Sequence, residues 1–203
     1  MNKKEFIVNT LQEMFPNASC ELVYHNNFEL LISIILSAQT TDKKVNSVTP
    51  LLFGKYPDAY KLMDADIKTV ASIIRILGLA NSKAKNIILT AKMLVEKYDG
   101  NIPNTKAELV KLAGVGVKTA NVYMAEGLGM NAFGVDTHVL RVSNRLGISK
   151  SKNPLVVEAD LINFFPNENW AKLHIQFIFF GRYHCTSRNP KCANCKFIRY
   201  CHF

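Results

Sequence analysis

Four cysteines near the end of the chain restrict its fold more than any other feature of the sequence. They are Cys185, Cys192, Cys195 and Cys201, whereas the fifth cysteine, Cys20, stands alone. Thiolates crowded in this way can enclose one soft metal centre, and in a reducing compartment such a cluster indicates metal rather than disulfides. We therefore expect residues 185–201 to form a loop closed around metal, and Cys20 to be a small buried side chain.

The spacing of the cysteines bears on the identity of the metal. Six, two and five residues separate successive cysteines, which is not the paired short spacing of a zinc ribbon. Zinc remains the competitor of an iron-sulfur cluster, because four cysteines also suit a closed tetrahedral zinc site. No acidic residue occurs between residues 181 and 203, and the cations there can offset thiolate charge and contact phosphates. These cations are Arg182, Arg188, Lys191, Lys196 and Arg199.

Apolar residues elsewhere recur mainly at helical spacing, without the alternation or turn pairs typical of hairpin strands. The pattern predicts an all-α chain with helices at residues 4–15, 28–39, 43–53, 66–77, 83–97, 106–112, 117–128, 137–146, 154–164 and 170–183. Residue types at the helix ends predict the caps. The predicted caps are Asp42 and Ser82 at helix starts, Thr105 opening a capping box, and Gly78 and Gly147 at helix ends.

The charge balance indicates the kind of partner. Lysine and arginine total 25 against 16 aspartate and glutamate, a formal net charge of +9, which favours nucleic acid first and a membrane surface second. The longest apolar run, residues 30–38, is interrupted by two serines and is far shorter than the roughly 20 residues of a membrane span. The N-terminus does not have the pattern of a signal peptide. We expect a soluble, intracellular (cytoplasmic) protein without membrane association.

Two glycines, Gly114 and Gly116, lie between two predicted helices. Glycine permits a tight turn and exposes backbone amides at the start of the second helix, where the helix dipole attracts a phosphate. The alternative is a plain turn between helices. Lys118 follows directly, and from the residues alone it is a phosphate contact. A nucleophilic Lys118 requires an unprotonated amine, which predicts the positive end of a helix and burial around it.

Several segments together resemble the endonuclease III family of DNA glycosylases. Residues 112–120 read LAGVGVKTA, similar to the helix-hairpin-helix of that family. In family order, residues 36–42 read LSAQTTD, residues 78–84 read GLANSKA and residues 135–139 read VDTHV, and the cysteines follow. Ala113 departs from the usual hairpin proline, and Ala80 stands where a larger residue is common. The resemblance extends from about residue 28 to residue 201.

The resemblance implies a two-lobed fold with DNA and the active site between the lobes. Residues 21–130 are expected to form a six-helix lobe containing the hairpin. Residues 1–20 and 131–203 are expected to form a lobe with a C-terminal [4Fe-4S] cluster loop held by the four cysteines. We expect no room after Cys201 for the extra domain of adenine-mismatch enzymes.

The function implied is that of a base-excision DNA N-glycosylase with an associated AP lyase activity, acting as a monomer on double-stranded DNA that contains damaged bases or abasic sites. Oxidised pyrimidines are the family default. The alternatives are a non-catalytic iron-sulfur or zinc DNA-binding module and a monofunctional mismatch adenine glycosylase.

The resemblance also implies roles for individual residues. Lys118 is expected to attack the sugar C1′ and form a Schiff base, although its default role is a phosphate contact. Asp136 is expected to be the catalytic aspartate, although by local pattern it is an N-cap. Gln39 and Leu79 are expected to fill the gap left by a flipped nucleotide. Further DNA contacts are expected from Gly114, Gly116, Arg188 and Lys191.

Overall fold

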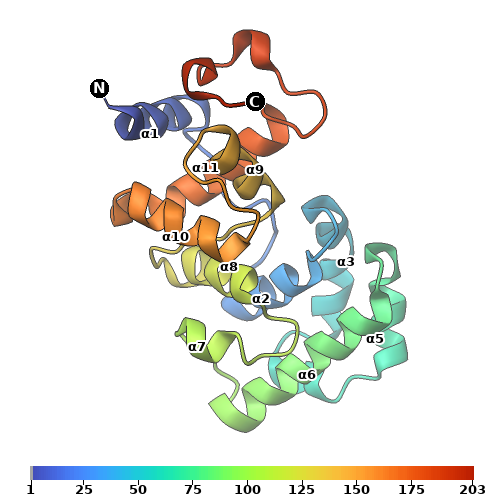
Figure 1. Ribbon diagram of the computed structural model, residues 1–203. Coiled ribbons are helices and arrows are strands. Elements are labelled where there is room, and N and C mark those ends of the chain that lie inside the picture. The colour runs from blue at the N-terminus through green and yellow to red at the C-terminus, as the bar shows by residue number, and fades with distance from the viewer. Residues whose placement is uncertain (1) are drawn as a thin grey trace. The chain divides into compact units, whose positions relative to one another are not determined.

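A computed structural model describes residues 2–203, so that Met1, the first residue of the expected 1–20 segment, lies outside the described residues. Within those residues every regular element is a helix (Figure 1), and the predicted all-α class is confirmed. None of the helices described is long and apolar enough to cross a membrane. The chain divides into two compact units, one comprising Glu21–Leu128 and the other joining the segment up to Cys20 with Gly129–Phe203.

The unit Glu21–Leu128 is built around one helix that is buried along most of its length. Its elements are α2 (Asn27–Leu36), α3 (Asp42–Lys55), α4 (Ala59–Met63), α5 (Ile67–Ile73), the short 3-10 helix η1 (Arg75–Leu77), α6 (Ala80–Tyr98), α7 (Lys106–Leu109) and α8 (Val117–Leu128). Every residue of α2 from Glu29 to Leu36 is buried, because α3, α6 and α8 pack around it. A helix that is apolar all round has to be central, and burying each of its Leu or Ile side chains stabilises the fold by about 1.5–3 kcal/mol.

The other unit joins both ends of the chain. Its elements are α1 (Lys3–Met14), α9 (Thr137–Arg145), α10 (Pro154–Phe164), η2 (Asn167–Asn169), α11 (Trp170–Tyr183), η3 (Cys192–Asn194) and η4 (Ile198–Tyr200). α11 packs against α9 and α1, and α10 packs against α9. Phe197, between η3 and η4, is fully buried and meets Phe180 of α11 edge to face, with ring centroids 4.9 Å apart. This aromatic contact fastens the cysteine loop to the helical core.

Some helix ends differ from the prediction. α2 ends at Leu36 instead of residue 39, and α6 begins at Ala80 instead of residue 83. The predicted caps Asp42 and Ser82 are wrong: Thr41 caps α3, and Ser82 lies inside α6, whose N-cap is Leu79. α4 was not predicted, because five residues are too few to show helical periodicity.

Other predicted ends are confirmed. Thr105 caps α7 by accepting a hydrogen bond from the Glu108 amide at 3.3 Å, whereas the Glu108 carboxylate, which a capping box turns back to the Thr105 amide, binds Tyr98 and Lys111 instead. Gly147 has φ +62°, and its amide and that of Ile148 donate to the carbonyls of Asn144 and Ser143, the Schellman arrangement.

Candidate functional site

The glycine hairpin, residues 112–116, joins α7 to α8. Gly114 has φ +76°, and a Cβ there would lie 3.0 Å from the Asn86 side chain, so glycine is required. The Thr90 hydroxyl donates to the Ala113 carbonyl at 2.7 Å and holds the turn from α6. Gly116 is different, because a Cβ there would meet nothing within 4 Å. Its exposed backbone leaves the start of α8 open to a ligand.

Lys118 is the second residue of α8, so the prediction that it lies at a helix start is confirmed. The prediction of burial around it is wrong, because the side chain is exposed.

Asp136 caps α9 and is partly buried. Its Oδ1 accepts the amides of His138 and Val139, each at 2.8 Å, which fixes the carboxylate at the helix start. The local prediction of an N-cap is therefore confirmed. Lys118 belongs to the Glu21–Leu128 unit and Asp136 to the other.

His138 and Arg141, further along α9, have structural partners. The Arg141 guanidinium donates to the carbonyls of Gly181, at 2.8 Å, and Cys185, at 3.1 Å, and contacts His138 Nδ1 at 3.2 Å. Burial, reinforced by nearby arginines, lowers the pKa of His138, while Asp136 opposes the shift. These contacts favour a structural role for both residues.

Gln39 and Leu79 share a rare backbone conformation. Only three non-glycine residues in the described chain have positive φ, and they include Gln39 at +56° and Leu79 at +50°. A left-handed residue with a Cβ costs about 1–2 kcal/mol, so such strain is a reason to look for function. Both side chains are exposed, Leu79 by 64%, although water disfavours an exposed leucine. Strain and exposure coincide at the two residues expected to enter DNA.

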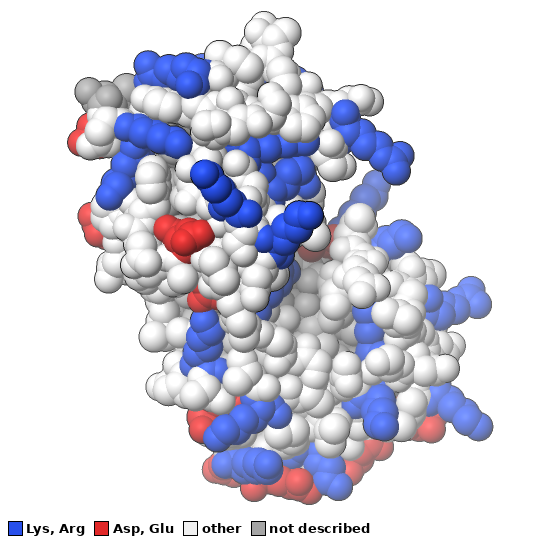
Figure 2. Space-filling model, viewed as in Figure 1, with Lys and Arg blue, Asp and Glu red and all other residues white. Residues whose placement is uncertain are grey.

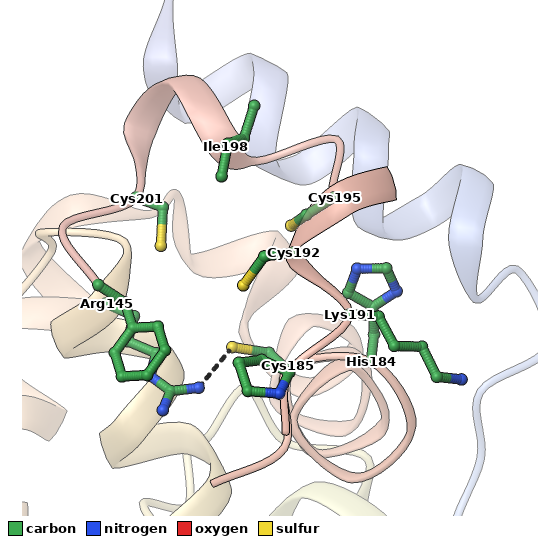
Figure 3. Close-up of a pocket in the computed structure, with 10 residues that line it drawn as sticks. Arg145, His184, Cys185, Lys191, Cys192, Cys195, Ile198 and Cys201 are labelled. Atoms are coloured by element: carbon green, nitrogen blue, oxygen red, sulfur yellow. Dashed lines mark hydrogen bonds between the residues drawn. The ribbon is translucent and has the colours of Figure 1, made fainter. Parts of the chain in front are cut away.

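The four clustered cysteines point toward one space (Figure 3). They line one pocket, together with Arg145, His184, Pro190, Lys191, Ile198 and Phe203. Burial raises the pKa of the Cys195 thiol, and the three neighbouring cysteines raise it further. Four thiolates brought together need positive charge to offset their repulsion, and a metal cluster supplies such charge. No set of three or more His, Cys, Asp or Glu within residues 2–203 is arranged to hold a single metal ion.

Arg145, the last residue of α9, binds Cys185, the first of the four clustered cysteines. Its Nη1 donates to Cys185 Sγ at 3.2 Å (Figure 3). The same Nη1 donates to the Thr186 carbonyl at 2.8 Å, and Nη2 donates to the Ser187 carbonyl at 3.1 Å. The guanidinium also lies over the ring of Phe203, 3.7 Å from the centroid. This set of contacts was not predicted, since spacing along α9 does not reveal what its arginines reach.

The expected phosphate contacts Arg188 and Lys191 are both exposed in the cysteine loop. Lysine and arginine side chains are spread over the visible face of the unit that holds this loop, with few acidic side chains among them (Figure 2). Such a surface attracts a polyanion.

Comparison with known proteins identifies the class of protein to which this chain belongs. Residues 32–167 match the HhH-GPD superfamily of base excision DNA repair proteins. The chain is 46% identical over 198 residues to endonuclease III of Bacillus subtilis (strain 168), covering 97% of this chain and 90% of that protein. It is also 43% identical to the protein in a non-covalent endonuclease III–DNA complex, with a TM-score of 0.95 over 100% of this chain and 96% of the other.

A second solved structure, a trapped endonuclease III–DNA covalent intermediate, matches with the same identity and TM-score and covers 97% of that chain. The chain belongs to the endonuclease III family.

Proposed function

We propose that the protein is a bifunctional DNA glycosylase, which releases damaged bases from duplex DNA and then cleaves the strand at the abasic site. The observation that carries the proposal is Lys118 at the start of α8, in a chain whose relative has been trapped covalently on DNA. Oxidised pyrimidines are the proposed substrates.

Lys118 is the proposed nucleophile. The lone pair of the unprotonated amine attacks C1′, and the bond to the base breaks with its electron pair leaving on the base, which takes up a proton. Ring opening gives a Schiff base between Lys118 and C1′. Loss of a C2′ proton then drives β-elimination, in which the C3′–O bond breaks and its electrons depart with the phosphate. Water releases the lysine.

Asp136 is proposed to act through its negative charge. Positive charge develops on the sugar as the base departs, and a carboxylate held by two amides needs no reorganisation to stabilise it. The same carboxylate can accept or return a proton during ring opening.

The exposed side chains of Leu79 and Gln39 are proposed to occupy the space of the flipped nucleotide. Leucine is an apolar wedge between bases, and the amide of Gln39 can meet the hydrogen-bonding edge of the base left without a partner. The glycine hairpin, with Gly114 and Gly116, is proposed to bind a backbone phosphate through its exposed amides.

We infer that the four cysteines hold a [4Fe-4S] cluster. All four cysteines line one pocket, and the Arg145 contact to Cys185 suits a sulfur that carries negative charge. When bound, the cluster supplies iron–thiolate bonds that cross-link residues 185–201. The chain's own contribution is to shape a basic loop, from which Arg188 and Lys191 reach phosphates.

Borohydride trapping tests the catalytic proposal. The protein is mixed with duplexes carrying thymine glycol, an abasic site or an adenine mismatch, and borohydride reduces any Schiff base to a stable adduct. We expect adducts on the first two duplexes, and none with Lys118→Gln although it still binds. Lys111→Gln, which removes an exposed lysine near the same hairpin, is the matched control and should trap normally. A Lys118→Gln protein that traps like wild type contradicts the assignment, and trapping only on the mismatch points to a different lesion.

A further inference from the structure

Lys83 is a lysine in the interior of the Glu21–Leu128 unit. It is 5% exposed, and it occupies the first position of the buried stripe of α6 that continues with Ile87 and Thr90. Lysine is rarely buried unless it is paired, and burial lowers the pKa of this amine. In the part of the chain that the structure describes, the amine donates one hydrogen bond, to the Leu77 carbonyl at 3.1 Å.

The two hydrogen bonds donated by Lys83 hold the backbone on both sides of Gly78. The side-chain amine donates to the Leu77 carbonyl, and the backbone amide donates to the Leu79 carbonyl at 2.9 Å. The backbone at these two hydrogen bonds is left-handed, because Gly78 has φ +71° and Leu79 has φ +50°. A bulky residue stays in the left-handed region only where surrounding contacts impose that conformation.

The geometry excludes a nucleophilic role for Lys83, because a 5% exposed amine directed at a backbone carbonyl cannot reach a sugar in bound DNA. The same geometry allows Lys83 to shape the turn at Leu77–Leu79, from which the exposed side chain of Leu79 projects.

We propose that Lys83 is a positioning residue, whose ammonium holds the Leu77 carbonyl and thereby keeps Leu79 in the exposed, left-handed conformation from which it enters the DNA stack. The inference rests on the wedge role of Leu79 proposed above. Lys83 acts through the turn and touches no reacting atom.

The test uses 2-aminopurine placed beside a tetrahydrofuran abasic analogue in a duplex saturated with the full-length protein. Insertion of Leu79 unstacks the probe and raises its fluorescence. Lys83→Met keeps the apolar stem and removes the ammonium, so we expect it to lose most of this rise, as Leu79→Ala does. Single-turnover base release should fall by about tenfold or more, as expected when a positioning group is lost. Lys83→Arg, which restores a cationic donor, should recover part of both signals.

Two controls separate positioning from general stability. Lys85→Met removes an exposed lysine from the same helix and should leave the fluorescence rise unchanged. In a Leu79→Ala background, Lys83→Met should lower base release no further, whereas any loss of thermal stability should persist. Circular dichroism confirms that each variant is folded, and Lys83→Leu, which also removes the ammonium, serves if Lys83→Met does not fold.

Three results overturn the proposal. One is a folded Lys83→Met protein with the fluorescence rise and base release of wild type. Another is that Lys83→Met lowers base release in the Leu79→Ala background as much as it does when Leu79 is present, which indicates that the lysine is merely structural. The third is a Leu79→Ala protein with an unchanged fluorescence rise, which removes the wedge role and with it the role of Lys83. Trapping through Lys118 is measured separately and survives all three, so failure here is distinguishable from failure of the catalytic proposal.

Discussion

One carboxylate at the start of α9 combines a structural and a proposed chemical role. Capping needs only an oxygen that accepts the amides of His138 and Val139, and an asparagine supplies one equally well. Stabilising positive charge on a sugar needs the full negative charge of Asp136. The two roles can therefore be separated by substitution.

For Asp136→Asn we expect turnover to fall by orders of magnitude while the free energy of unfolding changes little. Asp136→Ala is the matched variant: it loses both roles, and losing the cap should destabilise the protein by about 1 kcal/mol. Urea unfolding measures stability, and single-turnover base release measures chemistry. An Asp136→Asn protein that is as active as wild type leaves Asp136 as a cap alone.

Left-handed backbone at Gln39 and Leu79 could not be predicted, because bulky and polar side chains do not favour that conformation locally. Their positions along the chain came from the family resemblance, which carries no dihedral angles. Lys83 gives a weaker signal in the sequence, because it is a lysine on a mainly apolar helical stripe. Such a conflict with the local pattern is typical of functional positions.

At the scale of elements, periodicity predicted the long helices well, because their buried faces repeat at helical spacing. α8 illustrates this, because it spans the residues predicted, whereas α2, which is buried on nearly all sides, ends three residues earlier than predicted. Spacing could not show that arginines of α9 reach the cysteine loop, since contacts between elements distant in sequence depend on tertiary packing. The four cysteines were predicted as a group, and they do line one cavity.

The cysteine loop leads to a prediction about its metal. Purified protein should be yellow-brown and contain about four irons per chain, as a [4Fe-4S] cluster requires. Cys192→Ser should lower the iron content and the melting temperature, because it removes one of the four proposed ligands through which the cluster cross-links the loop. Cys20→Ser, outside the loop, is the control and should keep its iron. One zinc and no iron per chain contradicts the cluster.

Tyr123 in α8 makes the stability of its unit depend on pH. The side chain is 1% exposed, and burial raises its pKa from 10.0 to about 12. Because the folded state favours the neutral phenol, its contribution to stability is complete below pH 10 and is lost as the pH rises toward 12.

We therefore expect the free energy of unfolding to decline between pH 10 and 12, by about 2–3 kcal/mol from Tyr123 at full effect. Tyr123→Phe should remove that part of the decline and leave stability near neutral pH almost unchanged. Urea unfolding at a series of pH values measures the difference between the two proteins. If the free energy of unfolding falls with pH in parallel for the two proteins, Tyr123 is not the source of the decline.

For the whole molecule, the net charge of +9 favours binding to DNA, and the number of phosphate contacts determines how that binding depends on salt. Each phosphate neutralised releases condensed counterions, so the logarithm of affinity falls linearly with the logarithm of salt concentration. The slope measures how many cations contact phosphate, which total charge alone does not reveal. Arg188 and Lys191 are exposed cations in a loop without acidic residues, and are therefore expected to contribute to that slope.

Reversing both charges, in Arg188→Glu with Lys191→Glu, should weaken binding to all duplexes alike, since phosphate contacts carry no sequence information. The salt slope should become shallower by about one for each phosphate that is no longer neutralised.

The matched control reverses Lys92, an exposed lysine of α6 paired with Glu96, together with Lys97 on the same helix, so that total charge changes equally. Fluorescence anisotropy over a range of about 50 to 200 mM salt gives both slopes. If the two double variants shift affinity and slope equally, long-range charge alone explains the binding and the cysteine loop does not touch DNA. A change confined to the Arg188 and Lys191 variant places phosphate at that loop.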